Sequence, residues 1–85
     1  MNTEDMPPQP PRRFDVLEMF VIYDHPKDYP DFVVLRVWSV HAGRVEPGIS
    51  YVEKTIEACR RHLPNGAINI GRQPGDDPVI VEVWV

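Results

Sequence analysis

The sequence predicts a small α+β domain with the element order β-β-α-β. Runs of β-branched and aromatic residues at 17–23, 32–41 and 79–85 predict three strands, and an apolar stripe of helical period between the last two predicts one helix. Pro, Gly and Asp cluster at the junctions, as in turns. A chain of 85 residues with one cysteine allows one domain and no intramolecular disulfide. We place this single α+β domain at residues 14–85.

Residues 1–13 are predicted to form a disordered, proline-rich tail. They hold four of the ten prolines, and proline has a fixed φ and no amide hydrogen. The segment has neither the basic start nor the apolar run of a signal peptide, and no stretch approaches the ~18 apolar residues of a membrane span. Because a lone cysteine suits a reducing compartment, we expect a cytoplasmic protein without membrane contact.

The first two predicted strands form an antiparallel hairpin. The strand at 17–23 is apolar on both faces, whereas the strand at 32–41 has a clear apolar face made by Val33, Leu35 and Val37. The acidic residues and prolines at 24–31 predict a rigid loop between the strands, and residues 42–47 predict another loop.

The helix is predicted from a capping signature and an apolar stripe. Ser50 and Glu53 match the S-x-x-E capping box, in which each side chain bonds the backbone of the other residue. The stripe consists of Val52, Ile56, Cys59 and Leu63, and Pro64-Asn65-Gly66 ends the helix. The basic run Arg60-Arg61-His62 falls in the last turn, where it suits the helix dipole.

A right-handed crossover through the helix brings the strand at 79–85 beside the first strand. The expected sheet is three-stranded and mainly antiparallel, with order 2-1-3 and the helix on one face, which is half of a ferredoxin-like fold. Residues Ile68–Ile70 form either an extra short strand or an extended connector. We expect the helix to cover the face that carries Met19, Val21, Leu35 and Val83.

The opposite face is then predicted to be an interface. Its proposed residues are Phe20, Ile22, Arg36, Trp38, Ile80 and Trp84. Exposed aromatic surface usually marks an interaction site, and symmetric dimers are the commonest oligomers, so we expect a homodimer. The alternatives are an unidentified protein partner, or a cover formed by the tail or by residues 42–50. Nucleic acid is not expected, because the net charge is −4 and basic residues are not clustered.

A second hypothesis is a ligand or metal site at one end of the sheet. It would use six residues of the acidic loops: Asp24, His25, Asp28, Asp31, Asp76 and Asp77. Carboxylates with an imidazole can bind a hard cation, but their spacing matches no known metal loop. We find no catalytic motif and no cofactor motif, and Cys59 belongs to the helix core. A non-enzymatic protein is therefore expected.

Two segments resemble a known group of proteins. The run from Tyr23 to Val34 (YDHPKDYPDFVV), followed by Arg36 and Trp38, and the C-terminal run DDPVIVEVWV are similar to short uncharacterised proteins of bacterial and bacteriophage genomes. The resemblance covers roughly residues 17–85 and leaves out the proline-rich tail. It implies a bacterial or phage setting, and it implies no catalytic or binding residues.

Overall fold

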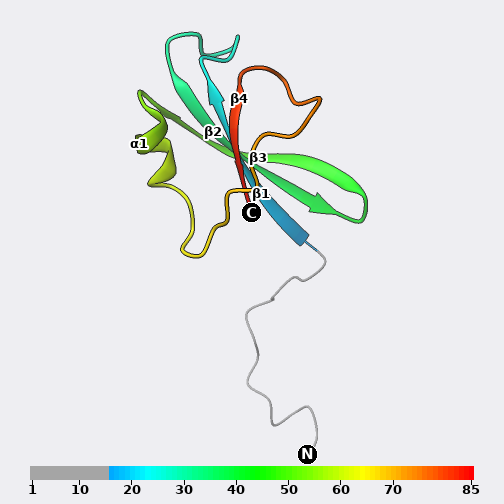
Figure 1. Cartoon of the computed structure of the whole chain (residues 1–85). Coiled ribbons are helices and arrows are strands. Elements are labelled where there is room, and N and C mark those ends of the chain that lie inside the picture. The colour runs from blue at the N-terminus through cyan, green and yellow to red at the C-terminus, as the bar shows by residue number, and fades with distance from the viewer. Residues whose placement is uncertain (1–15) are drawn as a thin grey trace, which may run out of the picture.

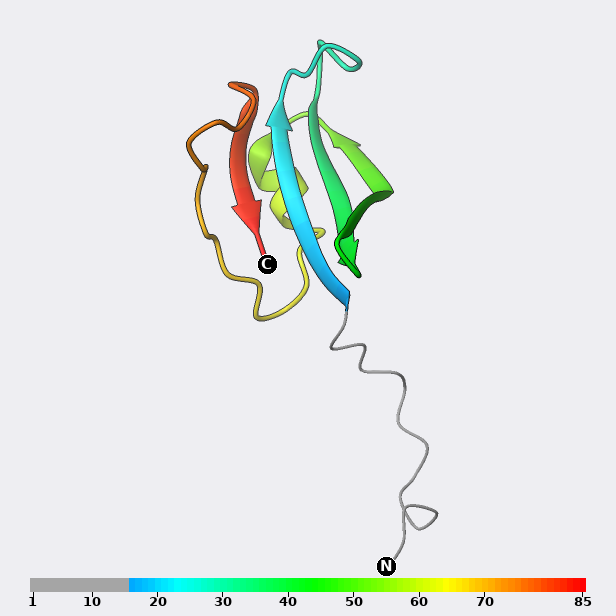
Figure 2. The same ribbon diagram turned by 90° about the vertical axis from the view of Figure 1, so that its right-hand side faces the viewer.

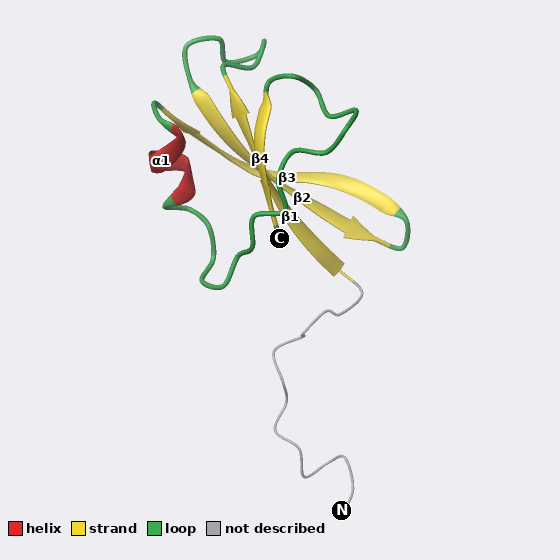
Figure 3. Ribbon diagram, viewed as in Figure 1, coloured by secondary structure: helices red, strands yellow, loops and turns green. Residues whose placement is uncertain are grey.

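A computed structural model describes residues 16–85, and the predicted tail at residues 1–13 lies outside the described residues. The described chain forms one four-stranded sheet and one short helix (Figures 1 and 3). The elements are β1 (Val16–Asp24), β2 (Val33–His41), β3 (Arg44–Glu53), α1 (Ile56–Arg60) and β4 (Ile80–Trp84). The sheet order is β3-β2-β1-β4, and all neighbouring strands are antiparallel. The mixed α+β class is thus confirmed, and the predicted strands keep their relative order.

The fourth strand, β3, corrects the prediction of a loop and a helix start at residues 42–53. Ala42 and Gly43 have φ values of 52° and 76°, and they form a two-residue turn that folds β3 back onto β2. The ladder between β2 and β3 shifts register between Arg36 and Trp38. Gly48 of β3 lies close to Val37 at this point, and a Cβ atom on Gly48 would come within 3.1 Å of the Val37 carbonyl oxygen. Pro47 is tolerated because β3 is an edge strand.

The helix is shorter than predicted, and a different residue caps it. Ser50 and Glu53 lie in β3, so the predicted capping box is wrong. Thr55 is the N-cap, and its side-chain oxygen accepts a hydrogen bond of 3.0 Å from the Ala58 backbone N–H. So short a helix is unstable alone, and burial of Cys59 against the sheet holds it in place.

The core lies between α1 and one face of the sheet. It consists of the buried residues Phe20, Ile22, Val33, Leu35, Val37 and Cys59, with Tyr51, Ile56, Leu63, Val81 and Trp84 packed against them. The predicted apolar face of β2 is confirmed, and the predicted face of β1 is wrong. The predicted face of β4 is wrong in part, because Val81 packs against the core beneath the helix whereas Val83 lies on the opposite face beside Val21. Phe20 pairs with Val37 and Trp84, and Ile22 pairs with Leu35 and Glu82, so these residues face the helix.

The chain between α1 and β4 adds a short ladder to the edge of the sheet. Asn69 forms an isolated antiparallel bridge with Trp84. The Ile68 N–H donates to the Val85 carbonyl at 2.8 Å, and the Ile70 N–H donates to the Val83 carbonyl at 2.9 Å. The segment Ile68–Ile70 is therefore a connector hydrogen-bonded along β4.

A buried carboxylate connects α1 to β4. Glu82 is 8% exposed, and it accepts hydrogen bonds from the Arg60 guanidinium and, at 2.8 Å, from the Trp84 indole N–H. The hydrogen bonds from Arg60 hold the pKa of Glu82 below its ordinary value, although burial acts in the opposite direction. A charged residue such as Glu82 is expected to face solvent, but here the Arg60 guanidinium neutralises its charge beneath the helix.

The observed cap can be tested with a pair of alanine variants. Thr55→Ala removes the capping oxygen and should lower the free energy of unfolding by about 1 kcal/mol. Ser50→Ala, at an exposed position of β3, should change it by less than about 0.5 kcal/mol. Urea unfolding followed by circular dichroism measures both. A larger loss of unfolding free energy for Ser50→Ala than for Thr55→Ala would support the predicted capping box and contradict the observed cap.

The Glu82 site predicts an acid-dependent stability. Because the folded-state pKa is lowered, the stabilisation is present above the unfolded-state pKa of about 4.3 and is lost as pH falls through the folded-state value. Wild type should therefore lose more stability between pH 6 and pH 3 than Glu82→Gln, which cannot titrate there. Urea midpoints that fall in parallel for both proteins would contradict this account.

Candidate functional site

Figure 2 shows α1 on one side of the sheet, and the residues that the register places on the opposite face are mostly apolar. Because cross-strand partners share a face, the register defines four rows from β3 toward β1 and β4. The rows are Val45-Val40-Leu17, Pro47-Trp38-Met19, Ser50-Arg36-Val21-Val83 and Val52-Val34-Tyr23-Ile80. We call this surface the open face, since α1 packs on the other side. Leu17 and Val45, in the first row, are 52% and 59% exposed.

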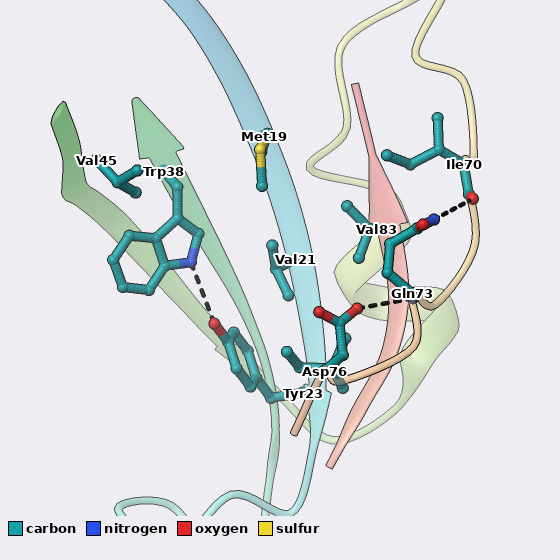
Figure 4. A pocket seen from close by; sticks show the side chains of 10 residues that line it. Met19, Val21, Tyr23, Trp38, Val45, Ile70, Gln73, Asp76 and Val83 are labelled. Carbon is teal, nitrogen blue, oxygen red and sulfur yellow. Dashed lines mark hydrogen bonds between the residues drawn. The ribbon is translucent and has the colours of Figure 1, made fainter. Parts of the chain in front are cut away.

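The open face contains an apolar hollow of about 440 Å³. Its floor is formed by strand residues such as Met19, Val21 and Val83 (Figure 4). Trp38 and Val45 stand on one side of it. On the other side lies the segment before β4, which contributes Ile70, Gln73 and Asp76. Segments distant in sequence therefore form the two walls of one concave surface.

Four side chains with polar atoms border this hollow, and each makes a hydrogen bond within the chain. The Trp38 indole N–H donates to the Tyr23 hydroxyl oxygen at 3.1 Å. The Gln73 side-chain amide donates to the Ile70 carbonyl at 3.1 Å, which turns it back toward its own segment. One carboxylate oxygen of Asp76 accepts the Gln73 backbone N–H at 2.8 Å and closes the turn (Figure 4).

A second, charged hollow of about 310 Å³ adjoins the first at Tyr23. Its lining includes two cations, Lys27 and Arg36, and two anions, Asp28 and Asp77. Arg36 forms an ion pair with Asp28, and its guanidinium lies 5.2 Å from the centre of the Tyr23 ring. These contacts hold the loop between β1 and β2 against β2.

The structure divides the six residues predicted as one interface. Arg36, Trp38 and Ile80 lie on the open face, as expected. Phe20, Ile22 and Trp84 instead belong to the core beneath α1. The sequence analysis missed the residues that take their places on the open face. Apolar residues occupy both faces of β1, so the alternation of polar and apolar residues does not show which face packs against the helix. The missed residues are Met19, Val21, Val45, Ile70 and Val83.

The six residues of the predicted ligand site do not assemble into a metal centre. Within residues 16–85, no three His, Cys, Asp or Glu side chains form a group that can hold a metal ion. Asp24 bonds the neighbouring His25, Asp28 bonds Arg36, and Asp31 lies exposed in the loop. Asp76 and Asp77 accept backbone N–H groups within the turn before β4. Asp28 and Asp77 line the charged hollow together, whereas Asp76 lines the apolar one.

Cys59 and His62 have structural surroundings. Cys59 is fully buried, and burial, assisted by the nearby Glu53 charge, raises the pKa of its thiol. His62 stacks on Tyr51 with ring centres 4.0 Å apart, and it hydrogen-bonds Glu53 at 2.7 Å. His62 therefore connects the end of α1 to β3, whereas the sequence analysis placed it in the last turn of the helix. Neither residue borders the two hollows.

Within residues 16–85, no helix is long and apolar enough to cross a membrane. Comparison with family models, curated proteins and solved structures found no match to this chain. The resemblance to short bacterial and phage proteins therefore stays a prediction.

The burial of Cys59 predicts a slow thiol. Its raised pKa and lack of exposure should make the reaction with Ellman's reagent at pH 8 slower than that of a free cysteine by a factor of about 100 or more. Concentrated urea should restore the rate of a free thiol. A fast reaction in the folded protein would show that α1 leaves the sheet readily and would contradict the packing described above.

Proposed function

We propose that this chain is a non-enzymatic interaction protein that forms a homodimer through the open face. The observation that supports the proposal most strongly is the apolar composition of that face, with Leu17 and Val45 more than half exposed. Large apolar surfaces in water are costly and commonly mark protein interfaces. The buried, unpaired Cys59 suits a reducing compartment, and we propose a cytoplasmic setting.

The charge distribution of the open face favours a second copy as the partner. The charged side chain within its four rows is Arg36, which is already paired with Asp28. Arg36 therefore brings no unpaired charge into contact when two identical faces meet, and the carboxylate of Asp76 lies at the border of the hollow, outside the four rows. The chain as a whole carries a net charge of −4, so the other surfaces are less suited to self-association.

The two edges of the sheet are poorer docking sites than its open face. The β3 edge carries Pro47, a register irregularity and the charged pair Arg44–Glu46, which are features that oppose strand pairing. The β4 edge is hydrogen-bonded to the connector at Ile68 and Ile70. The open face is thus the larger surface that remains for a partner.

The dimensions of the open face suit a small dimer interface. Four strands about 4.8 Å apart and four rows about 7 Å apart give a projected area of roughly 500 Å². Within this area Val21, Val34 and Val83 are 4%, 0% and 5% exposed, whereas Leu17 and Val45 are 52% and 59% exposed. The accessible area is therefore below the ~800 Å² that each partner buries in a standard interface.

Light scattering after size exclusion tests the proposal with two matched variants. Wild type should have twice the chain mass of 9.8 kDa, and Val45→Glu should shift the mass toward the monomer by placing a charge in the interface. Ile68→Glu is the control, because Ile68 is 64% exposed but does not line the apolar hollow. It should remain a dimer.

Two outcomes would contradict the proposal. A monomeric wild type at micromolar concentration would exclude a stable homodimer. Equal loss of the dimer in both variants would place the interface elsewhere. Circular dichroism of each variant confirms that the sheet is retained, since both substitutions lie at exposed positions.

A further inference from the structure

We propose that the apolar hollow of the open face binds a neutral, mainly apolar molecule that carries an amide-type group. This goes beyond the proposed dimer, because every group that lines the hollow comes from one chain. The ligand class follows from the shape of the hollow and from two of its polar side chains, Tyr23 and Asp76, each taken in turn below.

The size and lining of the hollow suit a small apolar ligand. Its volume of about 440 Å³ lies within the ~300–1,000 Å³ range typical of small-molecule sites. At ~30 Å³ each, roughly fifteen waters would fill it, and most would meet aliphatic or aromatic walls. Replacement of such waters by an apolar group is favourable.

Tyr23 supplies a hydrogen-bond donor with a defined position. Its hydroxyl oxygen accepts the Trp38 indole N–H, which fixes one side of the group. A hydroxyl has one hydrogen to donate, and no residue of the described chain accepts it. A ligand oxygen in the hollow can therefore receive the Tyr23 hydrogen bond.

Asp76 supplies an acceptor across the hollow from Tyr23 (Figure 4). One of its oxygens is engaged by the Gln73 backbone N–H, and the other has no partner within residues 16–85. The free oxygen can accept an N–H or O–H of a ligand. Its negative charge disfavours an anionic ligand in the same hollow.

These two groups together specify the polar part of the ligand. A carboxylate offers acceptors alone and meets the Asp76 charge, whereas an ammonium offers donors alone and leaves Tyr23 unsatisfied. A carboxamide offers both an oxygen and an N–H while remaining neutral. An apolar body that carries an amide therefore satisfies the walls and both polar side chains.

Titrations of the full chain with three probes test this inference by ¹⁵N–¹H correlation spectra. Benzamide should shift backbone signals of residues that line the hollow, Met19, Val21 and Ile70 among them. It should bind about fivefold or more tightly than benzoate, which loses the hydrogen bond to Asp76 and meets its negative charge. Benzylamine keeps a charge-assisted hydrogen bond to Asp76 but makes none with Tyr23, so it should bind no more tightly than benzamide. Failure of benzamide to shift these signals, or equal binding of the three probes, would overturn the inference.

Adjacent aspartates provide a matched pair of variants. Asp76→Asn keeps an oxygen toward the Gln73 N–H, which places its amide N–H₂ toward the hollow. Benzamide should then bind about fivefold more weakly, and benzoate more tightly than to wild type. Asp77→Asn changes a residue of the same turn that accepts the Val79 N–H and does not line the apolar hollow, so it should leave both affinities unchanged.

The oligomeric state is measured separately in the same samples. Light scattering reports the mass, while the titration reports the ligand. Because the hollow lies within the proposed interface, the titration is made at a protein concentration at which light scattering reports a monomer. A monomer that binds benzamide as described supports the ligand site, and a mass that stays monomeric at higher concentration excludes the dimer. A monomer with no chemical shift change at the hollow overturns the ligand site, whereas dimer formation at higher concentration still supports the proposed function.

Discussion

The pairing of β1 with β2 is the constraint on which the rest of the structure depends. It places Phe20 beside Val37 and Ile22 beside Leu35, so these side chains lie beneath α1. The alternate residues of β1, Met19 and Val21 among them, must then line the other face. A shift of one residue would exchange the two sets. The core and the open face are therefore two consequences of one register.

The helix face is completed by polar contacts as much as by apolar packing. α1 spans only Ile56–Arg60, too short to be stable alone. Cys59 anchors it in the core, Arg60 binds the buried Glu82, and His62 stacks on Tyr51 of β3. One face is covered in this way, and among the elements formed by residues 16–85 there is no second helix for the other face. That asymmetry is why both the proposed dimer and the proposed ligand site belong to the open face.

The sequence predicted the α+β class and the relative order of three strands. The β-branched runs identify those strands, but the crossover argument does not account for their order, because α1 joins β3 to β4 and these strands are antiparallel. The sequence did not predict β3, since Pro47, Gly48 and the Ser50–Glu53 pattern favour a loop and a helix start. Nor did it predict the open face correctly. β1 is apolar on both sides, and Glu82 looks solvent-facing until its partner Arg60 is placed. A contact such as Arg60 with Glu82 joins residues far apart in the sequence, so no local sequence pattern predicts it.

Tryptophan fluorescence tests the central claim most directly, because the register puts Trp38 on the open face and Trp84 in the core. Trp84→Phe leaves Trp38 as the reporter, and Trp38→Phe leaves Trp84. Iodide quenching of Trp38 should fall as protein concentration rises and copies associate, while quenching of Trp84 should be low and independent of concentration. A concentration-dependent Trp84 signal with a constant Trp38 signal would contradict the assignment of the two faces.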